Sequence, residues 1–148
     1  MKKNINRKIV FIYISRFFVE SERLRRKWAE DALCVIASGD SPASMIIDIS
    51  GNLLGMKIKR GMLLKDIRHL KTDINVIIVD YEYMKEMNDT VIADLKDYSA
   101  VIESSNFGEF YIDLTGTERL FGRTIDTCGR IISGLKERYG FECRAGIA

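Results

Sequence analysis

The stretch that decides the fold is NFGEFYIDLTGTERLFG, residues 106–122, which reads as a strand that runs into a glycine turn. Side chains alternate between the two faces of a strand, so Gly108, Phe110, Ile112 and Leu114 form an apolar face that belongs against a core. The odd-numbered residues include two carboxylates, Glu109 and Asp113, on either side of Tyr111. Gly108 is an unusual choice, because glycine weakens a strand and adds nothing that packs. Either a functional side chain is missing at this position, or something approaches the backbone too closely for a side chain to fit.

The bulk composition is that of an ordinary domain without a dominant charge. The chain of 148 residues is 47% hydrophobic, enough to bury a core, and its net charge of +2 gives no global field that compels nucleic-acid binding. The three cysteines are widely spaced and form no CxxC pair, so we expect reduced thiols in a cytoplasmic protein. The basic start followed by a short apolar run predicts a strand rather than a signal peptide. No stretch reaches the ~20 apolar residues of a membrane helix, so we expect no membrane association.

Hydrophobic periodicity divides the chain into strands and helices. Strands are predicted at 8–14, 32–37, 44–49, 74–80, 100–105, 109–114 and 141–147. Helices are predicted at 61–70, 81–98 and 123–139. A further helix, capped by Ser15, carries apolar positions from Phe17 to Trp28. In the last helix the apolar stripe begins at Ile125, and Gly140 stands at the expected C′ position.

The order of these elements indicates the fold class. When residues 16–79 are left out, the remaining order is βαββαβ, the split ferredoxin-like arrangement. We therefore expect an α/β (α+β) chain in which a small α/β lobe is inserted after the first strand. Strand 74–80, in the inserted lobe, is expected to be buried because it is almost entirely apolar.

Four segments carry a resemblance to a known family. They are IVFIYISRFFVESE at 9–22, GMKIKRGMLLKDIRHL at 55–70, LKDYSAVIESSNFGEFYIDLTGTERLFG at 95–122 and RAGIA at 144–148. Together they resemble the catalytic core of the Y-family (UmuC/DinB-type, impB/mucB/samB) DNA polymerases, cut off partway through the palm. The phrase D-x-T-G-x-x-R-L-F-G is typical of ImuB-like members.

The resemblance implies a domain organisation and a set of partners. Residues 1–15 and 80–148 would form the palm and 16–79 the fingers lobe, while thumb and little-finger domains would be absent from this chain, as in a cloned fragment. It implies a role in DNA repair, in damage tolerance of the SOS type and in mutagenic translesion synthesis. We expect weak, salt-sensitive DNA binding by this fragment alone. Replicative or repair polymerase partners would bind through a C-terminal region outside it.

The resemblance also answers the question raised by Gly108. In the family, an aspartate on the first strand and an adjacent Asp-Glu pair on the third palm strand hold two Mg²⁺ ions for phosphoryl transfer. Aligned with this chain, the three positions are Tyr13, Gly108 and Glu109. A neutral phenol is a poor Mg²⁺ ligand and glycine offers none, so Glu109 would be a vestige of the catalytic site. We expect no metal and no cofactor; Mg²⁺ would be needed only by an active polymerase.

The nucleotide contacts implied by the resemblance are partly lost. A tyrosine and an arginine that hold the triphosphate in the family fall at Gly51 and Leu54, which supply no charge-assisted contact. The steric-gate position, which excludes ribonucleotides, falls on Phe18, with Phe17 beside it, and both aromatics are retained. Aromatics at a helix start also commonly pack in a core, so the nucleotide-binding role of the two phenylalanines competes with a structural one.

Other candidate residues favour ordinary surface roles. Glu109 can also be read as an exposed carboxylate on a sheet face, and Asp113 as a residue that shapes a strand end. His69 has no further ligand at metal-binding spacing. The basic runs at 23–27 and 57–60 could contact a DNA backbone. Acidic neighbours favour a solvated helix face instead, and these are Glu20, Glu22 and Glu30.

Three functions of different class remain open. The first is a non-catalytic, ImuB-like protein that brings another polymerase to damaged DNA. The second is an active, error-prone translesion polymerase, which would need other carboxylates to converge on the site. The third is a ferredoxin-like binding module without a role on DNA. The independent losses at Tyr13, Gly108 and the triphosphate positions favour the first, and the DLTGTERLFG segment argues against the third.

Overall fold

The computed structural model describes residues 6–29, 31–70 and 73–148. The chain divides into two compact units, here called unit 1 (Met1–Ser15 with Lys85–Ala148) and unit 2 (Arg16–Met84). Helix α2, Tyr81–Leu95, contains the boundary between them. No helix in the described part of the chain is long and apolar enough to cross a membrane.

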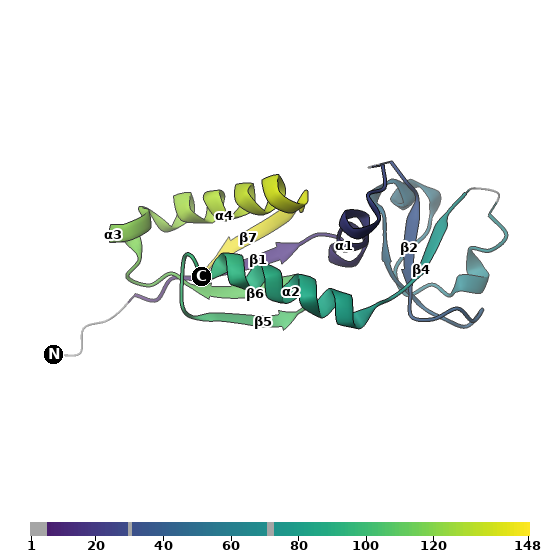
Figure 1. Cartoon of the computed structure of the whole chain (residues 1–148), viewed down its shortest axis with the longest axis horizontal. Coiled ribbons are helices and arrows are strands. Elements are labelled where there is room, and N and C mark those ends of the chain that lie inside the picture. The colour runs from purple at the N-terminus through teal and green to yellow at the C-terminus, as the bar shows by residue number, and fades with distance from the viewer. Residues whose placement is uncertain (1–5, 30, 71–72) are drawn as a thin grey trace. The chain divides into compact units, whose positions relative to one another are not determined.

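Unit 1 is built around an antiparallel sheet (Figure 1). Its described strands are β1 (Ile9–Ile14), β5 (Ile102–Asn106), β6 (Glu109–Asp113) and β7 (Cys143–Ile147). They lie in the order β5-β6-β1-β7. With α2 between β1 and β5, and α4 (Thr124–Tyr139) between β6 and β7, the order is βαββαβ. The predicted ferredoxin-like arrangement, with Ile9–Ile14 as an interior strand beside β6, is confirmed.

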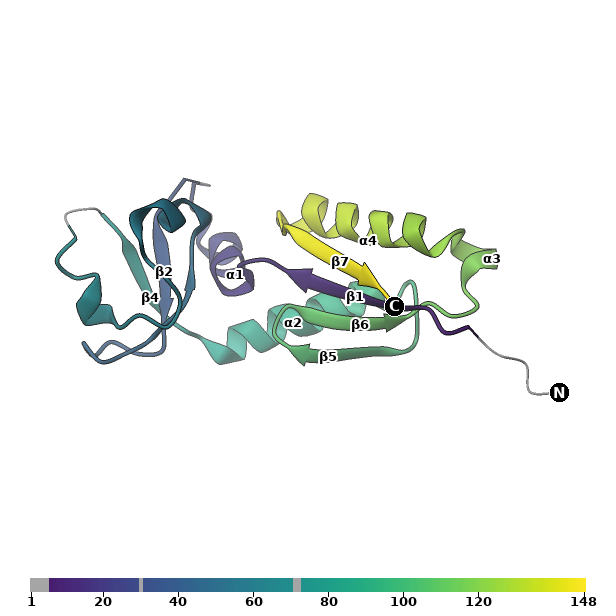
Figure 2. The same ribbon diagram turned by 180° about the vertical axis from the view of Figure 1, so that it is seen from behind.

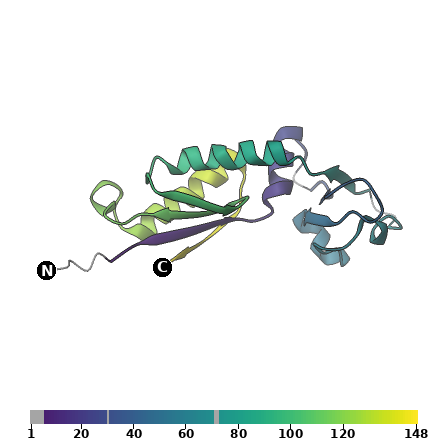
Figure 3. The ribbon, with the colours of Figure 1, turned by 90° about the horizontal axis from the view of Figure 1, so that it is seen from below.

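One face of this sheet forms the core of unit 1. The inward side chains of β1 and β6, with the residue that follows β6, are at most 1% exposed: Val10, Ile12, Ile14, Phe110, Ile112 and Leu114. Helices α2 and α4 lie on this side of the sheet (Figure 3) and contribute Val91, Leu95, Cys128, Ile131 and Leu135. Burial of each such side chain contributes roughly 2 kcal/mol. The strict alternation along β1 and β6 therefore fixes which residues point to the opposite face.

Unit 2 contains a smaller sheet among its described residues. Strands β2 (Cys34–Ala37), β3 (Ile46–Ile49) and β4 (Asn75–Ile78) lie in the order β3-β2-β4. Helix α1 (Phe17–Arg26) contributes Val19 to the apolar cluster on one face. Two 3-10 turns, η1 (Gly51–Met56) and η2 (Leu64–Asp66), contribute Leu53 and Leu64 to the cluster on the other face.

Two expectations for unit 2 are wrong. Residues 61–70 do not form a helix, and only η2 is helical there. The backbone of this segment pairs with the strand region instead: the Gly61 N–H donates to Ile46 O at 2.8 Å, and the Ile46 N–H donates to Met62 O at 2.7 Å. The strand predicted at 74–80 is not buried, because β4 is an edge strand with Val76 and Ile78 about half exposed (49% and 50%).

Three details of the helices also differ from expectation. Ser15 does not cap α1, because the cap position is taken by Arg16 in a left-handed conformation (φ 53°). Ile125 in α4 is 63% exposed, and the buried side of the helix begins at Thr124 and continues through Ile131. A short helix, α3 (Glu118–Phe121), follows β6 and was not predicted. Gly140 ends α4 in the left-handed conformation that its C′ position predicts.

Candidate functional site

The residues aligned with the family's metal ligands lie side by side in unit 1. In the register of β1 and β6, Tyr13 is directly opposite Glu109. The Ile14 N–H donates to Gly108 O at 2.8 Å, which places Gly108 beside the end of β1. The structure therefore brings together Tyr13, Gly108 and Glu109, as the sequence alignment requires.

Gly108 is in a tight turn rather than in a strand. Phe107 and Gly108 connect β5 to β6, and Gly108 has φ 78°, a left-handed conformation that glycine adopts without a steric penalty. Its buried N–H donates to Asn88 Oδ1 at 2.8 Å, and Asn88 Nδ2 donates to Ser104 Oγ at 3.0 Å. Position 108 thus lacks a carboxylate and is also built for glycine.

Asn88 is a residue of this site that sequence reasoning missed. It lies on α2, is only 7% exposed, and occupies a position between the apolar residues Met84 and Val91. A buried amide needs hydrogen-bond partners, and Asn88 finds them in the turn at Gly108 and in β5. A polar residue within the predicted apolar stripe of α2 was the available signal.

Glu109 is engaged locally. Its Oε2 accepts hydrogen bonds from Ser105 Oγ at 3.0 Å and from Asn106 Nδ2 at 3.2 Å. Both donors belong to the end of β5, so Glu109 supports the hairpin that carries it. With a phenol at Tyr13 and no side chain at Gly108, these three residues do not fit a pair of Mg²⁺ ions.

Asp113 does not replace the missing carboxylates. It lies on the same face of β6 as Glu109 but four residues away, a separation of about 13 Å along the strand. Hydrogen bonds from Thr115 and the Arg7 guanidinium lower the pKa of Asp113 to about 2, and Arg7 Nη2 is 3.0 Å from Asp113 Oδ2. Across the residues that the structure describes, no group of three or more His, Cys, Asp or Glu side chains is arranged to hold a metal ion.

The two positions aligned with the triphosphate contacts lie in η1 of unit 2. Leu54 is 63% exposed, and a side chain at Gly51 would meet the Arg16 guanidinium, 3.2 Å from a Cβ at that position. Arg16, Glu20, Arg23, Asp31, Gly51 and Asn52 line a pocket of about 330 Å³. The Arg16 Nε is buried and has no hydrogen-bond partner among the described residues. Arg16 is a second residue that sequence reasoning missed, because its place depends on its left-handed backbone.

Phe17 and Phe18 both take part in the packing of unit 2. Phe17 is 3% exposed, and Phe18 packs against the cluster formed by Val19, Cys34, Ile36 and Ile77. Their ring centroids are 6.1 Å apart at an interplanar angle of 82°. Their steric-gate role stays a prediction.

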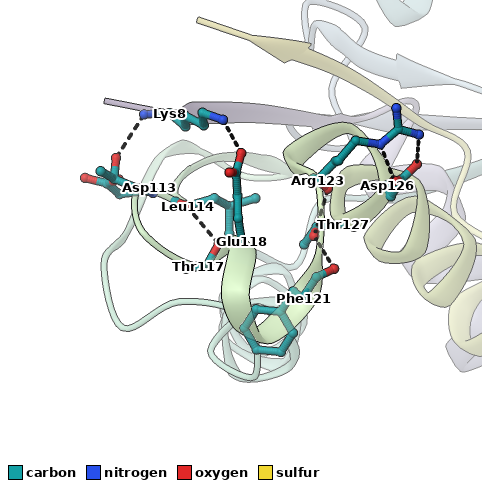
Figure 4. A network of polar contacts seen from close by, with 10 residues as sticks. Lys8, Asp113, Leu114, Thr117, Glu118, Phe121, Arg123, Asp126 and Thr127 are labelled. Atoms are coloured by element: carbon teal, nitrogen blue, oxygen red, sulfur yellow. Dashed lines mark hydrogen bonds and ion pairs between the residues drawn. The ribbon is translucent and has the colours of Figure 1, made fainter. Parts of the chain in front are cut away.

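The DLTGTERLFG segment, the most specific sequence match, is held by its own polar contacts (Figure 4). Thr115 Oγ1 accepts a hydrogen bond from the Lys8 N–H at 2.9 Å, and Thr117 Oγ1 donates to Leu114 O at 2.8 Å. Thr127, on α4, donates to Phe121 O at 3.2 Å. These contacts connect β1, α3 and α4, so the segment has a structural role within unit 1.

Arginines of both basic runs form ion pairs with buried carboxylates, whereas a solvated helix face was expected. Glu22 is fully buried, with Arg25 Nη2 at 2.5 Å and Arg26 Nε at 3.0 Å. In the second run, Arg60 Nη2 lies 3.0 Å from Asp48 Oδ1. The expectation that acidic neighbours form a solvated surface is wrong for Glu22; Glu30 lies outside the described residues.

Comparisons with known proteins find relatives over nearly the whole chain. A sequence model of the impB/mucB/samB family matches residues 12–148. The chain is 28% identical over 146 residues to a DNA polymerase IV of Clostridium kluyveri and 26% identical over 145 residues to one of Alkaliphilus oremlandii. Each alignment covers 97% of this chain and 36% of the relative, so the chain spans about a third of the length of these curated relatives.

Solved structures show the same fold. A post-insertion binary complex of Dbh DNA polymerase superimposes with a TM-score of 0.84, and DinB from Sulfolobus solfataricus with 0.80. Both are 14% identical in sequence, and each match covers 95% of this chain and 42% of the solved one. At this identity the likeness concerns the fold alone.

Proposed function

The chain belongs to the impB/mucB/samB family of Y-family DNA polymerase domains, and we propose that within it this chain is non-catalytic and serves DNA damage tolerance as an ImuB-like accessory protein. One observation carries the proposal: Tyr13, Gly108 and Glu109, which the resemblance aligns with the family's metal ligands, lie together and hold a single carboxylate. Two-metal phosphoryl transfer requires ligands for both ions.

The turn at Gly108 supports the loss of the metal site. The Asn88 amide accepts the Gly108 N–H and fixes a left-handed backbone at the position of the missing aspartate. An L-residue there would be strained by about 1 kcal/mol. The surrounding structure is therefore adapted to glycine, and a single reverse substitution would meet a backbone cost.

The domain assignment is part of the proposal. Unit 1 would be the palm and unit 2 the fingers lobe. In unit 2, Gly51 and Leu54 offer no charged contact to a triphosphate, and the Arg16 guanidinium occupies the space beside Gly51. Phe17 and Phe18 would keep the steric-gate position without a nucleotide to select.

The partners follow from the same reasoning. Some solved relatives are described as binary and ternary complexes of Dbh DNA polymerase, and we propose that this chain also contacts DNA, weakly by itself. A partner polymerase would be recruited through a region outside this chain. No cofactor is needed for such a role.

A second function is favoured by one observation, because the similar curated proteins carry the name DNA polymerase IV. In that case the chain would be part of an active translesion polymerase that uses Mg²⁺. Glu109 would then be indispensable, together with carboxylates supplied from elsewhere.

Primer extension separates the two functions. The full-length gene product, with Mg²⁺ and a primer–template, is expected to incorporate no templated nucleotide, while a DNA polymerase IV assayed in parallel extends the primer. Extension by the wild type that Glu109→Ala abolishes would establish the active polymerase. Extension that survives Glu109→Ala would point to a contaminating enzyme, which a mock purification from cells that do not express this protein would identify.

A further inference from the structure

Aromatic side chains gather on the open face of the unit 1 sheet, meaning the face opposite α2 and α4. Phe11 and Tyr13 point to it from β1, and Tyr111 points to it from β6, because the residues between them are buried on the other side. In Figure 2 these central strands lie in front of α2, with no helix of unit 1 over them. Phe11 is directly opposite Tyr111, and their ring centroids are 4.9 Å apart. Tyr111 is 43% exposed.

The side of this platform toward β7 is accessible and basic. The β7 residue opposite Phe11 is Gly146, where an added Cβ would find no heavy atom within 4 Å. The β7 residue opposite Tyr13 is Arg144, which is exposed. Its guanidinium makes no hydrogen bond or ion pair with the residues that the structure describes. An unengaged cation therefore stands next to the aromatic platform.

Two of the carboxylates on this face, Glu109 and Asp113, have polar partners, and a third, Glu103, lies on β5, on the side away from β7. Glu109 accepts hydrogen bonds from Ser105 and Asn106, and Asp113 is paired with Arg7. Glu103, opposite Tyr111 on β5, is exposed. The face thus carries carboxylates on β5 and β6, including Glu109 opposite Tyr13, three aromatic side chains on the central strands, and the cation of Arg144 on the β7 side.

We propose that this open face binds single-stranded DNA by stacking unpaired bases on Phe11, Tyr13 and Tyr111, with the phosphates on the Arg144 side. In the RRM, aromatics on a four-stranded sheet stack two or three bases of single-stranded RNA, and aromatics bind single-stranded DNA in the same way because every base offers a π-face. A duplex hides those faces, so it is not the ligand. The inference rests on the proposed function, since a tyrosine in place of a metal-binding aspartate both removes a charge that would repel phosphate and adds a stacking surface.

Fluorescence anisotropy with a labelled 12-nucleotide single strand, and with the duplex of the same sequence, tests the proposal on this chain. The single strand is expected to bind more tightly than the duplex. Tyr111→Ala is expected to weaken single-strand binding roughly 5- to 100-fold, as loss of one stacking contact does. Tyr111→Phe should keep it, and Leu120→Ala, which alters an exposed side chain on α3, is the matched control away from the face.

Two charge variants test the orientation. Arg144→Ala should weaken binding and reduce the slope of log affinity against log salt by about 1. Glu103→Gln should tighten it. At high salt, where contacts to phosphate are screened, the wild type should still bind the single strand through stacking, and Tyr111→Ala should lose this remaining binding.

Equal affinity for duplex and single strand, or unchanged binding by a Tyr111→Ala variant with a wild-type circular dichroism spectrum, would overturn the inference. Primer extension is a separate readout. Nucleotide incorporation would reject the proposed function whether or not the platform binds, whereas failure of stacking would leave the non-catalytic proposal standing.

Discussion

The two units of this protein use carboxylates in opposite ways. Among the described residues, unit 2 buries Glu22 and Asp48, and each is held by arginine. The buried polar side chains described in unit 1 are uncharged: Asn88, Thr124 and Thr127. Unit 2 therefore holds paired charges inside its fold, whereas the described core of unit 1 contains none. Under the proposed function, unit 1 keeps the fold of its family while Glu109 is the single carboxylate among the three positions aligned with the metal ligands.

In unit 2, the carboxylate of Asp48 accepts a hydrogen bond at the start of α1, where a local capping side chain is absent. Helix α1 has no side-chain cap of its own, and the carboxylate of Asp48, from β3, accepts the Val19 N–H in its first turn at 3.1 Å. Burial raises the pKa of Asp48, while the Val19 and Ile49 N–H groups and Arg60 lower it. Asp48 therefore connects α1, through Val19, and the segment before η2, through Arg60, to its own strand β3.

The largest effect that would sharpen this comparison is expected from Asp48→Ala. The substitution leaves the buried Val19 N–H unsatisfied and removes the partner of Arg60, so we expect a loss of about 3 kcal/mol in the free energy of unfolding. Urea denaturation measures it. Asp48→Asn, which keeps an acceptor, should lose less, and equal losses for the two variants would show that the hydrogen bonds to Asp48 do not matter.

A smaller effect is expected in unit 1 from Asn88→Ala. It removes the acceptor of the Gly108 N–H and the partner of Ser104, which should cost about 1–2 kcal/mol. Hydrogen exchange at the Gly108 amide should accelerate in this variant. Ser104→Ala is the matched control, because it spares the Gly108 bond. If Gly108 exchanges equally slowly in Asn88→Ala, the turn does not depend on the amide.

The smallest effect concerns the exposed pair of Asp113 and Arg7. The pKa of Asp113 is about 2 in the folded state, below its ordinary value of 3.8. A lowered folded pKa contributes stability that is present above about pH 4 and is lost as pH falls through 2. Between these pH values the wild type should lose slightly more thermal stability than Asp113→Asn, by a few degrees in Tm at most. Identical pH dependence would show that the hydrogen bonds from Thr115 and the ion pair with Arg7 contribute nothing through the Asp113 charge.

Hydrophobic periodicity correctly predicted the features of the fold that depend on residues close together in the sequence. The alternation of apolar and polar residues along β1 and β6 correctly predicted which face of the sheet is buried. The βαββαβ order was also predicted, because an apolar residue recurs every two positions in strands and every three to four positions in helices. The predicted placement of Tyr13 beside Gly108 and Glu109 is confirmed, while their correspondence to the family's metal ligands stays a prediction.

The errors arose where distant residues decide the local structure. Residues 61–70 have a helical pattern, but their backbone pairs with β3. Ser15 was expected to cap α1, yet Arg16 occupies the cap position, and Asp48 from β3 accepts the Val19 N–H in the first turn. The interpretation of Gly108 as a lost ligand stays a prediction, but it missed the role of Gly108 in the turn, which depends on Asn88, twenty positions earlier in the chain. None of these contacts has a signature within a short window of sequence.

Magnesium titration by calorimetry is the most direct test of the central claim, because it examines unit 1 without requiring any missing part of a polymerase. Wild-type chain is expected to give no saturable Mg²⁺ binding that depends on Glu109, since Tyr13 and Gly108 supply no carboxylate beside it. The Glu109→Ala variant should give the same trace. Saturable Mg²⁺ binding by the wild type that Glu109→Ala abolishes would contradict the account.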